Sequence, residues 1–212
     1  MRPARGGLDS LPGHRVRLIV AKEPGKAGAI THYKMDVHAY HRMAAADVFG
    51  PEDRVELLRG ELVAMAPIGQ DHAGTVNRLT YALVMAFGVR AIVSVQNPVR
   101  LDNESEPQPD FAVFRPREDF YTTGTVPGPA DTLLLIEVAD SSVLTDRAMK
   151  LPLYAEARVP ELWIIDLKRR VLECYRGPDG ERYTELRTYG PDDSISLALA
   201  PEVSLSLRQV FG

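Results

Sequence analysis

Apolar positions follow two different periods along the chain and predict both helices and strands. Between Asp71 and Phe87 they recur at steps of three and four, which is typical of an amphipathic helix. The expected buried side of this helix carries Val76, Leu79, Leu83 and Phe87. Asp71 suits the N-cap, because its carboxylate can accept hydrogen bonds from the first free N–H groups. Another helix is predicted over residues 35–49, where Gly50-Pro51 ends it.

Alternating and continuous apolar runs predict the strands. Residues 54–67 form two alternating stretches around Arg59-Gly60, where glycine permits a tight turn, and so predict a hairpin. Five more strands are expected, within residues 91–101, 111–114, 133–138, 162–166 and 171–175. The order of helices and strands predicts an α/β or α+β fold with a mixed β-sheet flanked by helices.

The segment between the last two apolar runs predicts a helix from Ser141 or Ser142 to Ala157. One expected face carries Leu144, Ala148, Leu151 and Ala155. Pro152 lies inside this helix and cannot donate a backbone hydrogen bond, so we expect a kink or an early end there.

Length and composition narrow the class of protein. The 212 residues fit one domain, which we place at 34–212. Residues 1–33 are rich in Gly, Pro, Arg and Lys without a sustained period, and we expect a flexible tail. Cys174 is the single cysteine, which excludes an internal disulfide and suits a reducing compartment. No apolar run approaches a membrane span and no leader pattern is evident, so a cytoplasmic protein without a membrane partner is expected.

The formal net charge of −4 argues against a protein that coats nucleic acid nonspecifically. It is compatible with an enzyme that meets phosphate through a metal ion at one local site.

Glu137 is the most unusual residue in this pattern. It follows four apolar residues, 133–136, in a run typical of a strand covered on both faces. Burial of an ionised carboxylate there costs on the order of several kcal/mol unless a cation compensates for it. The sequence therefore has to supply that cation.

Asp110 is the expected partner of Glu137. Pro-Asp occurs three times in the chain, but only Asp110 enters an apolar strand. Alternation places Asp110 on one face with Ala112 and Phe114, and Glu137 on one face with Leu133 and Leu135. If these strands are neighbours, one register brings the two carboxylates together, where a hard divalent ion such as Mg²⁺ would relieve their repulsion.

The spacing of other polar residues leaves their roles open. Lys150 lies four residues from both Asp146 and Tyr154, and spacing alone favours a surface pair with Asp146. Glu56 fits an exposed hairpin carboxylate. His72, in the first turn of its helix, fits either a structural histidine or a site residue. Lys168-Arg169-Arg170 fits a polar hairpin turn better than a contact with a nucleic-acid backbone.

Six ordered motifs resemble the putative restriction endonuclease family, a bacterial branch of the PD-(D/E)XK nuclease superfamily. They are VELLRGELVAMAP, DHAGTVNRL, VSVQNPVRL, PQPDFAVF, LLLIEVADSS and DRAMKLPLYAEARVPELWIID. The resemblance covers about Met35 to Tyr175 and implies a restriction-endonuclease-like core for the domain at 34–212.

The resemblance also implies site residues. Pro109-Asp110 and Glu137 match the two acids of the superfamily pattern. Ala139 stands where that pattern has its lysine, and the branch resembled here carries a lysine on the following helix, which points to Lys150. The remaining implied residues are Glu56 as a further acid, and His72 and Gln96 as substrate-binding neighbours.

The implied activity is metal-dependent hydrolysis of phosphodiester bonds in DNA. Asp110 and Glu137 would bind Mg²⁺, or Mn²⁺ as a substitute, and Lys150 would stabilise negative charge on the phosphate. A homodimer would suit cleavage of two strands. Because of Ala139, a second expectation is a catalytically impaired nuclease-fold protein that binds nucleic acid or a protein partner.

Overall fold

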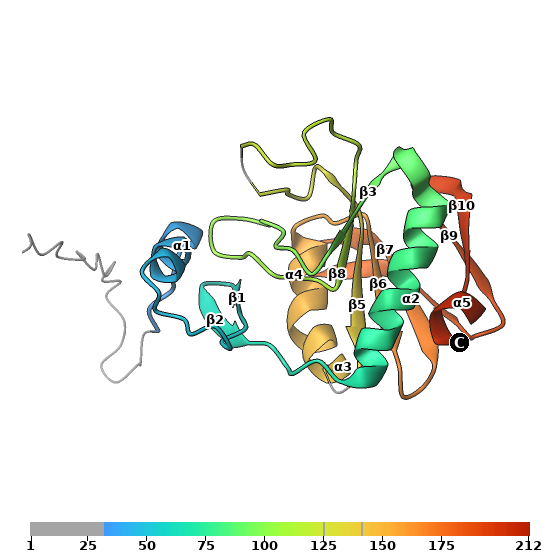
Figure 1. Ribbon diagram of the computed structural model, residues 1–212, viewed down its shortest axis with the longest axis horizontal. Helices are drawn as coiled ribbons and strands as arrows, with labels where there is room; N and C mark the ends of the chain where they lie inside the picture. The colour runs from blue at the N-terminus through green and yellow to red at the C-terminus, as the bar shows by residue number, and fades with distance from the viewer. Residues whose placement is uncertain (1–31, 125, 141) are drawn as a thin grey trace, which may run out of the picture. The chain divides into compact units, whose positions relative to one another are not determined.

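The structure is a computed structural model that describes residues 32–124, 126–140 and 142–212 (Figure 1). The chain divides into two units, Met1–Tyr33 and Lys34–Gly212, and the fold given below is that of the second. The expected tail at residues 1–33 lies almost wholly outside the described residues, so it stays a prediction.

Lys34–Gly212 is a mixed α+β unit. Its helices are α1 (Val37–Ala45), α2 (Gln70–Phe87), α3 (Val143–Thr145), α4 (Leu151–Glu156) and α5 (Arg208–Phe211), with a 3₁₀ turn η1 (Gly88–Arg90) and a π turn η2 (Asp146–Lys150). Its strands are β1 (Val55–Leu58), β2 (Glu61–Ala64), β3 (Ile92–Val95), β4 (Phe111–Phe114), β5 (Thr132–Ala139), β6 (Glu161–Asp166), β7 (Val171–Asp179), β8 (Arg182–Tyr189), β9 (Ser194–Leu197) and β10 (Ala200–Ser206).

A six-stranded sheet in the order β3-β4-β5-β6-β7-β8 forms the centre of the unit. β5 and β6 run parallel and are connected through α3, η2 and α4, whereas the other neighbours are antiparallel. β1–β2 and β9–β10 form separate hairpins. The mixed sheet flanked by helices that the sequence predicts is confirmed.

Both faces of the sheet are covered, which explains why β5 is buried along its whole length. On one face, α2, α5 and the β9–β10 hairpin pack against residues such as Phe111 and Ile136. On the other face, α4 packs against Ala112 and Leu135 (Figure 1). Within the described residues, no helix is both long and apolar enough to cross a membrane.

Helix α2 has the buried stripe that its periodicity predicts. Its four stripe residues are Val76, Leu79, Leu83 and Phe87, and all are buried. The predicted N-cap is wrong, because the helix begins at Gln70 with Gly69 in the capping position and no side-chain cap. Asp71 instead lies in the first turn, where its negative charge is still favourable near the positive end of the helix dipole.

The predicted hairpin is confirmed as β1–β2. Arg59 and Gly60 both have positive φ angles, 49° and 80°, as a two-residue turn between antiparallel strands requires. A Cβ on Gly60 would lie 2.7 Å from the Cβ of Lys34, so a glycine also fits the close approach of the chain before α1.

The predicted helix after β5 exists, and only the second half of its expected apolar face is confirmed. Ala155 is buried, and Leu151 packs half-buried against the core. Leu144 is 75% exposed and Ala148 is exposed, whereas Asp146, Lys150 and Tyr154 are buried against the sheet. The π turn at Asp146–Lys150 ends two residues before Pro152 and adds one residue to the turn. This extra residue shifts the helical phase and directs polar side chains inward.

The predicted face of β5 is also wrong at one residue. The β4–β5 pairing passes from Val113↔Leu134 to Phe114↔Thr132, so Leu133 has no partner. Leu133 packs with the α2 side of the sheet, whereas Leu135 packs with the α4 side. The irregularity lies at the start of β5 and leaves the register around Glu137 regular.

Candidate active site

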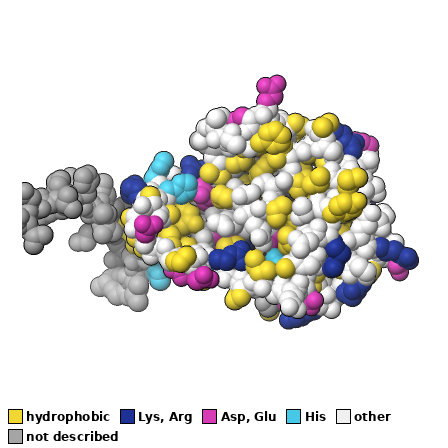
Figure 2. All heavy atoms as spheres, viewed as in Figure 1, with side chains coloured by type: hydrophobic (Ala, Val, Ile, Leu, Met, Phe, Trp, Pro, Cys, Tyr) yellow, Lys and Arg dark blue, Asp and Glu magenta, His cyan; other side chains and the backbone are white. Residues whose placement is uncertain are grey.

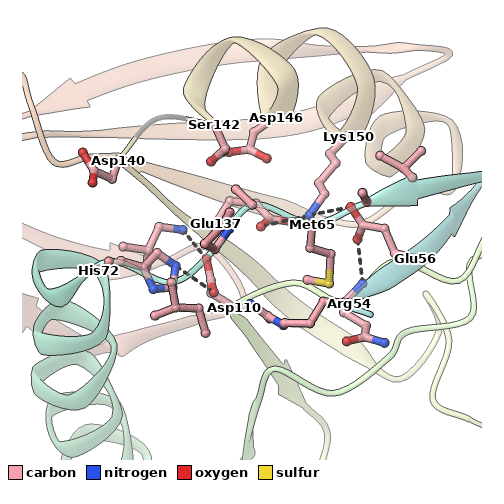
Figure 3. A pocket seen from close by; sticks show the side chains of 18 residues that line it. Arg54, Glu56, Met65, His72, Asp110, Glu137, Asp140, Ser142, Asp146 and Lys150 are labelled. Carbon is pink, nitrogen blue, oxygen red and sulfur yellow. Dashed lines mark hydrogen bonds and ion pairs between the residues drawn. The ribbon is translucent and has the colours of Figure 1, made fainter. Parts of the chain in front are cut away.

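A pocket opens where the β1–β2 hairpin, the start of α2, the start of β4, the end of β5 and the π turn meet (Figure 3). Five carboxylates line it, those of Glu56, Asp110, Glu137, Asp140 and Asp146. The cationic or ionisable nitrogen side chains of the lining are those of Arg54, His72 and Lys150. The structure thus gathers in one pocket five of the six site residues expected from the sequence, and it places Gln96 in contact with one of them.

The register of the sheet brings Asp110 and Glu137 together. Phe111 pairs with Ile136 in the antiparallel β4–β5 ladder, and continuing that register by one residue sets Asp110 opposite Glu137. Both side chains project from the face of the sheet that α4 and the π turn cover. The two carboxylates are therefore neighbours, as the sequence suggested.

Hydrogen bonds hold the Asp110 carboxylate in place. Its Oδ2 accepts from the Val138 N–H at 2.8 Å, and its Oδ1 lies 3.1 Å from His72 Nε2 and 3.2 Å from Gln96 Nε2. Burial acts to raise the pKa of Asp110, but the hydrogen bonds from His72, Val138 and Gln96 bring that pKa below its ordinary value. Asp110 is therefore ionised at neutral pH.

Glu137 is the buried acid of the pair. Its Oε1 accepts from the Tyr154 hydroxyl at 2.6 Å and lies 3.2 Å from Lys150 Nζ. Burial raises the pKa of Glu137 well above its ordinary value, and Lys150 opposes that rise. Asp110, Asp146 and Glu56 add to it, so the site holds more negative charge than its cations neutralise.

Lys150 supplies the cation that Glu137 requires. Its Nζ lies 3.2 Å from Oε1 of both Glu56 and Glu137, and the residue is 6% exposed (Figure 3). Burial acts to lower the pKa of Lys150, but Glu137 and Glu56 raise it above its ordinary value, so the amine keeps its proton. The surface pair with Asp146 that spacing favours is not formed, because Asp146 instead accepts from the Ser142 hydroxyl at 2.7 Å.

Glu56 is not an exposed hairpin carboxylate. It is 3% exposed, and its Oε2 accepts from the Gln108 N–H at 3.0 Å while its Oε1 faces Lys150. The hairpin is thereby fixed to the loop before Asp110. The exposed-carboxylate interpretation is wrong because β1 turns this side chain toward the sheet.

His72 and Gln96 both contact Asp110. His72 comes from the first turn of α2, and its hydrogen bond to Asp110 raises the pKa of the imidazole. Its Nδ1 is buried without a partner among the described residues. The backbone N–H of Gln96 also donates to the Asp110 carbonyl at 3.0 Å. Their expected contact with a substrate stays a prediction.

The donor atoms of the site suit a hard divalent cation. In residues 32–124, 126–140 and 142–212, no three His, Cys, Asp or Glu side chains are arranged to hold a metal ion. Mg²⁺, however, is commonly bound through one or two carboxylates, with water and substrate phosphate as its other ligands. Asp110 and Glu137 provide such a pair, and the surplus of negative charge around Glu137 favours a cation there.

Tyr154 is a site residue that our sequence reasoning missed. The signal was available, because Asp146, Lys150 and Tyr154 follow one another at steps of four and so share one face of a helix. The apolar residues of that segment instead favour a face through Leu144 and Ala148, which are exposed.

A salt-bridge network anchors the π turn that carries Lys150. Arg147 donates from Nε and Nη2 to the two carboxylate oxygens of Glu173 on β7, at 2.9 and 2.5 Å, and Tyr175 donates to Glu173 at 2.7 Å. Burial acts to raise the pKa of Glu173, but the hydrogen bonds from Arg147 and Tyr175 bring it below its ordinary value. Glu173 thus binds the turn to the sheet.

Replacing Glu173 with glutamine is expected to lower the free energy of unfolding by about 1–3 kcal/mol near neutral pH, because Arg147 loses a charged partner. A carboxyl whose folded-state pKa is lowered stabilises the fold above its unfolded-state pKa, and this contribution disappears as the pH falls through the folded-state value. Urea unfolding should therefore show a gap between wild type and Glu173→Gln that narrows in acid. Glu185→Gln, at an exposed position of β8, is the control and should show no gap.

Comparisons with known proteins identify a family from the sequence and a similar fold from a solved structure. Residues 37–208 match the family model described as Uma2, putative restriction endonuclease. The crystal structure of a putative nuclease belonging to DUF820 from Anabaena variabilis ATCC 29413 superposes with a TM-score of 0.65 and 16% identity, covering 84% of this chain and 97% of that one. At this identity the likeness concerns the fold. No curated protein matches the sequence.

Proposed function

The chain belongs to the Uma2 putative restriction endonuclease family, and from that premise we propose that it is a metal-dependent endonuclease that hydrolyses phosphodiester bonds in DNA. One observation carries the proposal. Asp110 and Glu137 meet across β4 and β5, and the buried Lys150 amine contacts Glu137 at 3.2 Å. A pair of acids with an adjacent fixed cation is an arrangement suited to phosphoryl chemistry.

Each residue has a proposed part in that reaction. Asp110 and Glu137 would hold Mg²⁺ or Mn²⁺, which when bound lowers the pKa of water and polarises a phosphate oxygen. Lys150 keeps a positive charge beside Glu137, where it can stabilise negative charge that develops on the phosphate. Glu56 orients the Lys150 amine through the 3.2 Å contact and is placed to accept a proton. His72 and Gln96 orient the Asp110 carboxylate.

The second candidate is a nuclease-fold protein that binds nucleic acid or a partner without cutting it. Ala139, buried at the end of β5, favours this alternative because it leaves the usual lysine position without a cation. Lys150 weakens the alternative, because its amine reaches Glu137 from the π turn instead.

Incubation with supercoiled plasmid DNA tests the proposal. We expect nicked and linear products in Mg²⁺ or Mn²⁺ and none in EDTA. Without a bound metal ion, the two carboxylates cannot polarise a phosphate oxygen or activate water. Binding without cleavage in both metals would overturn the enzymatic proposal and favour the second candidate. Cleavage confined to RNA would retain the chemistry and overturn the DNA substrate. The proposed homodimer is tested separately, by sedimentation with and without a DNA duplex.

A further inference from the structure

Arg54 lies at the open end of the β1–β2 hairpin, beside the candidate site. Its carbonyl accepts from the Met65 N–H at 2.8 Å, which continues the Val55↔Ala64 register by one pair. Because side chains alternate along a strand, Arg54 projects from the same side of the hairpin as Glu56. Arg54, Glu56 and Met65 all line the pocket (Figure 3).

The other two nitrogen side chains of the pocket already have carboxylate partners. Lys150 contacts Glu56 and Glu137, and His72 contacts Asp110. In the part of the chain that the structure describes, the Arg54 guanidinium forms neither a hydrogen bond nor an ion pair. The residue is half-buried, and none of its side-chain nitrogens is fully buried without a hydrogen-bond partner. Its donors are therefore open to a ligand.

The charge on Arg54 acts within the pocket. Arg54 lines the same pocket as His72 and the five carboxylates. With five carboxylates in the lining, a phosphodiester that enters the pocket meets strong repulsion. Elsewhere, on the face of the molecule seen in Figure 2, Lys and Arg side chains are dispersed and not gathered into one basic stripe. A phosphate that enters the pocket is thus stabilised more by a cation beside the acids than by the dispersed Lys and Arg side chains of the surface.

We propose that Arg54 binds a phosphate of the DNA backbone through two parallel N–H donors, next to the phosphate that is cleaved. The inference rests on the proposed function and assigns to the hairpin a substrate-binding residue. Guanidinium is suited to this contact, because its planar fork matches two phosphate oxygens and it is always charged. A lysine at the same position would keep the charge and lose the paired geometry.

Binding of a DNA duplex of about 30 bp in EDTA, over about 50–200 mM KCl, tests the contact without cleavage. Arg54→Ala and Arg54→Gln are expected to weaken binding by about 10-fold and to reduce the slope of log K against log salt by about 0.9, the value for one lost phosphate contact. Arg187→Ala, which removes an arginine from an exposed position on β8, is the matched control and should leave both quantities unchanged. An unchanged slope in both Arg54 variants would overturn the inference.

Plasmid cleavage by Arg54→Lys separates a paired contact from simple charge compensation. We expect a wild-type salt slope together with a kcat/KM about 5–10-fold below wild type, mostly through KM. Cleavage equal to wild type would show that charge alone suffices and would overturn the paired contact. Binding and cleavage by the wild-type protein test the proposed function independently. If it neither binds nor cuts DNA, that function fails and the DNA contact with it, whereas an active wild type with unaffected Arg54 variants overturns only the contact.

Discussion

Replacing Asp110 with asparagine is expected to lower plasmid cleavage by about 10³-fold or more, because an amide is a poor ligand for a hard divalent cation and carries no charge. The fold should survive the change. An asparagine oxygen can still accept from the Val138 N–H, which donates to Asp110 at 2.8 Å. Gln96 can turn its amide, and His72 can present the other tautomer because its Nδ1 has no partner among the described residues.

The matched control for this prediction is Asp179→Asn. Asp179 also follows a proline, but it lies exposed near the end of β7. We expect wild-type cleavage from this variant. Nicking rates measured over a range of Mg²⁺ concentrations, with circular dichroism to verify folding, give the comparison. Cleavage by Asp110→Asn within about tenfold of wild type would remove Asp110 from the site, since loss of a metal ligand costs far more than that.

The fold could be predicted where local pattern and tertiary burial agree. The continuous apolar run of β5 is buried on both faces, and the stripe of α2 packs on the sheet as its period predicts. The Asp110–Glu137 pair could be predicted for the same reason, since strand alternation and one antiparallel register are enough to bring them together.

The helix after β5 shows where such reasoning fails. Apolar residues predict its buried face only if that face packs on an apolar surface, whereas here it covers Glu137 and the other acids of the pocket. The buried side therefore includes polar residues beside apolar ones, and the π turn before Pro152 changes the helical phase. Pro152 predicts an interruption of the helix, but nothing in the sequence pattern predicts that a π turn accommodates it.

Burial likewise distinguishes between the roles that spacing left open for some residues. Glu56 and Lys150 each have an ordinary exposed interpretation in the sequence, and each is buried in the structure because it is the other's partner. An ion pair between residues almost a hundred positions apart has no signature in local spacing. Only the resemblance to a family connected them in advance.

Replacing Lys150 with methionine is expected to reduce cleavage by about 10²–10³-fold and the free energy of unfolding by about 3–5 kcal/mol near neutral pH. Methionine retains the apolar stem but leaves Glu56 and Glu137 buried without their cation. Lys168→Met is the matched control. Lys168 is 69% exposed and 4.0 Å from Asp140, so its loss should change stability by less than about 0.5 kcal/mol.

The pH dependence of unfolding in EDTA distinguishes loss of that cation from loss of packing. The folded-state pKa of Glu137 is already raised, and removal of Lys150 raises it further, because Lys150 is the charge that opposes the rise. A carboxyl with a raised folded-state pKa favours the folded state in acid and loses that contribution as the pH rises through the folded-state value. Lys150→Met should therefore approach wild-type stability in acid and fall below it as the pH rises, whereas a packing defect would give a constant difference. Lys150→Arg keeps the charge and should retain most of the stability, but it should still lose cleavage. A guanidinium cannot occupy the position of a compact amine 3.2 Å from two carboxylates without displacing one of them.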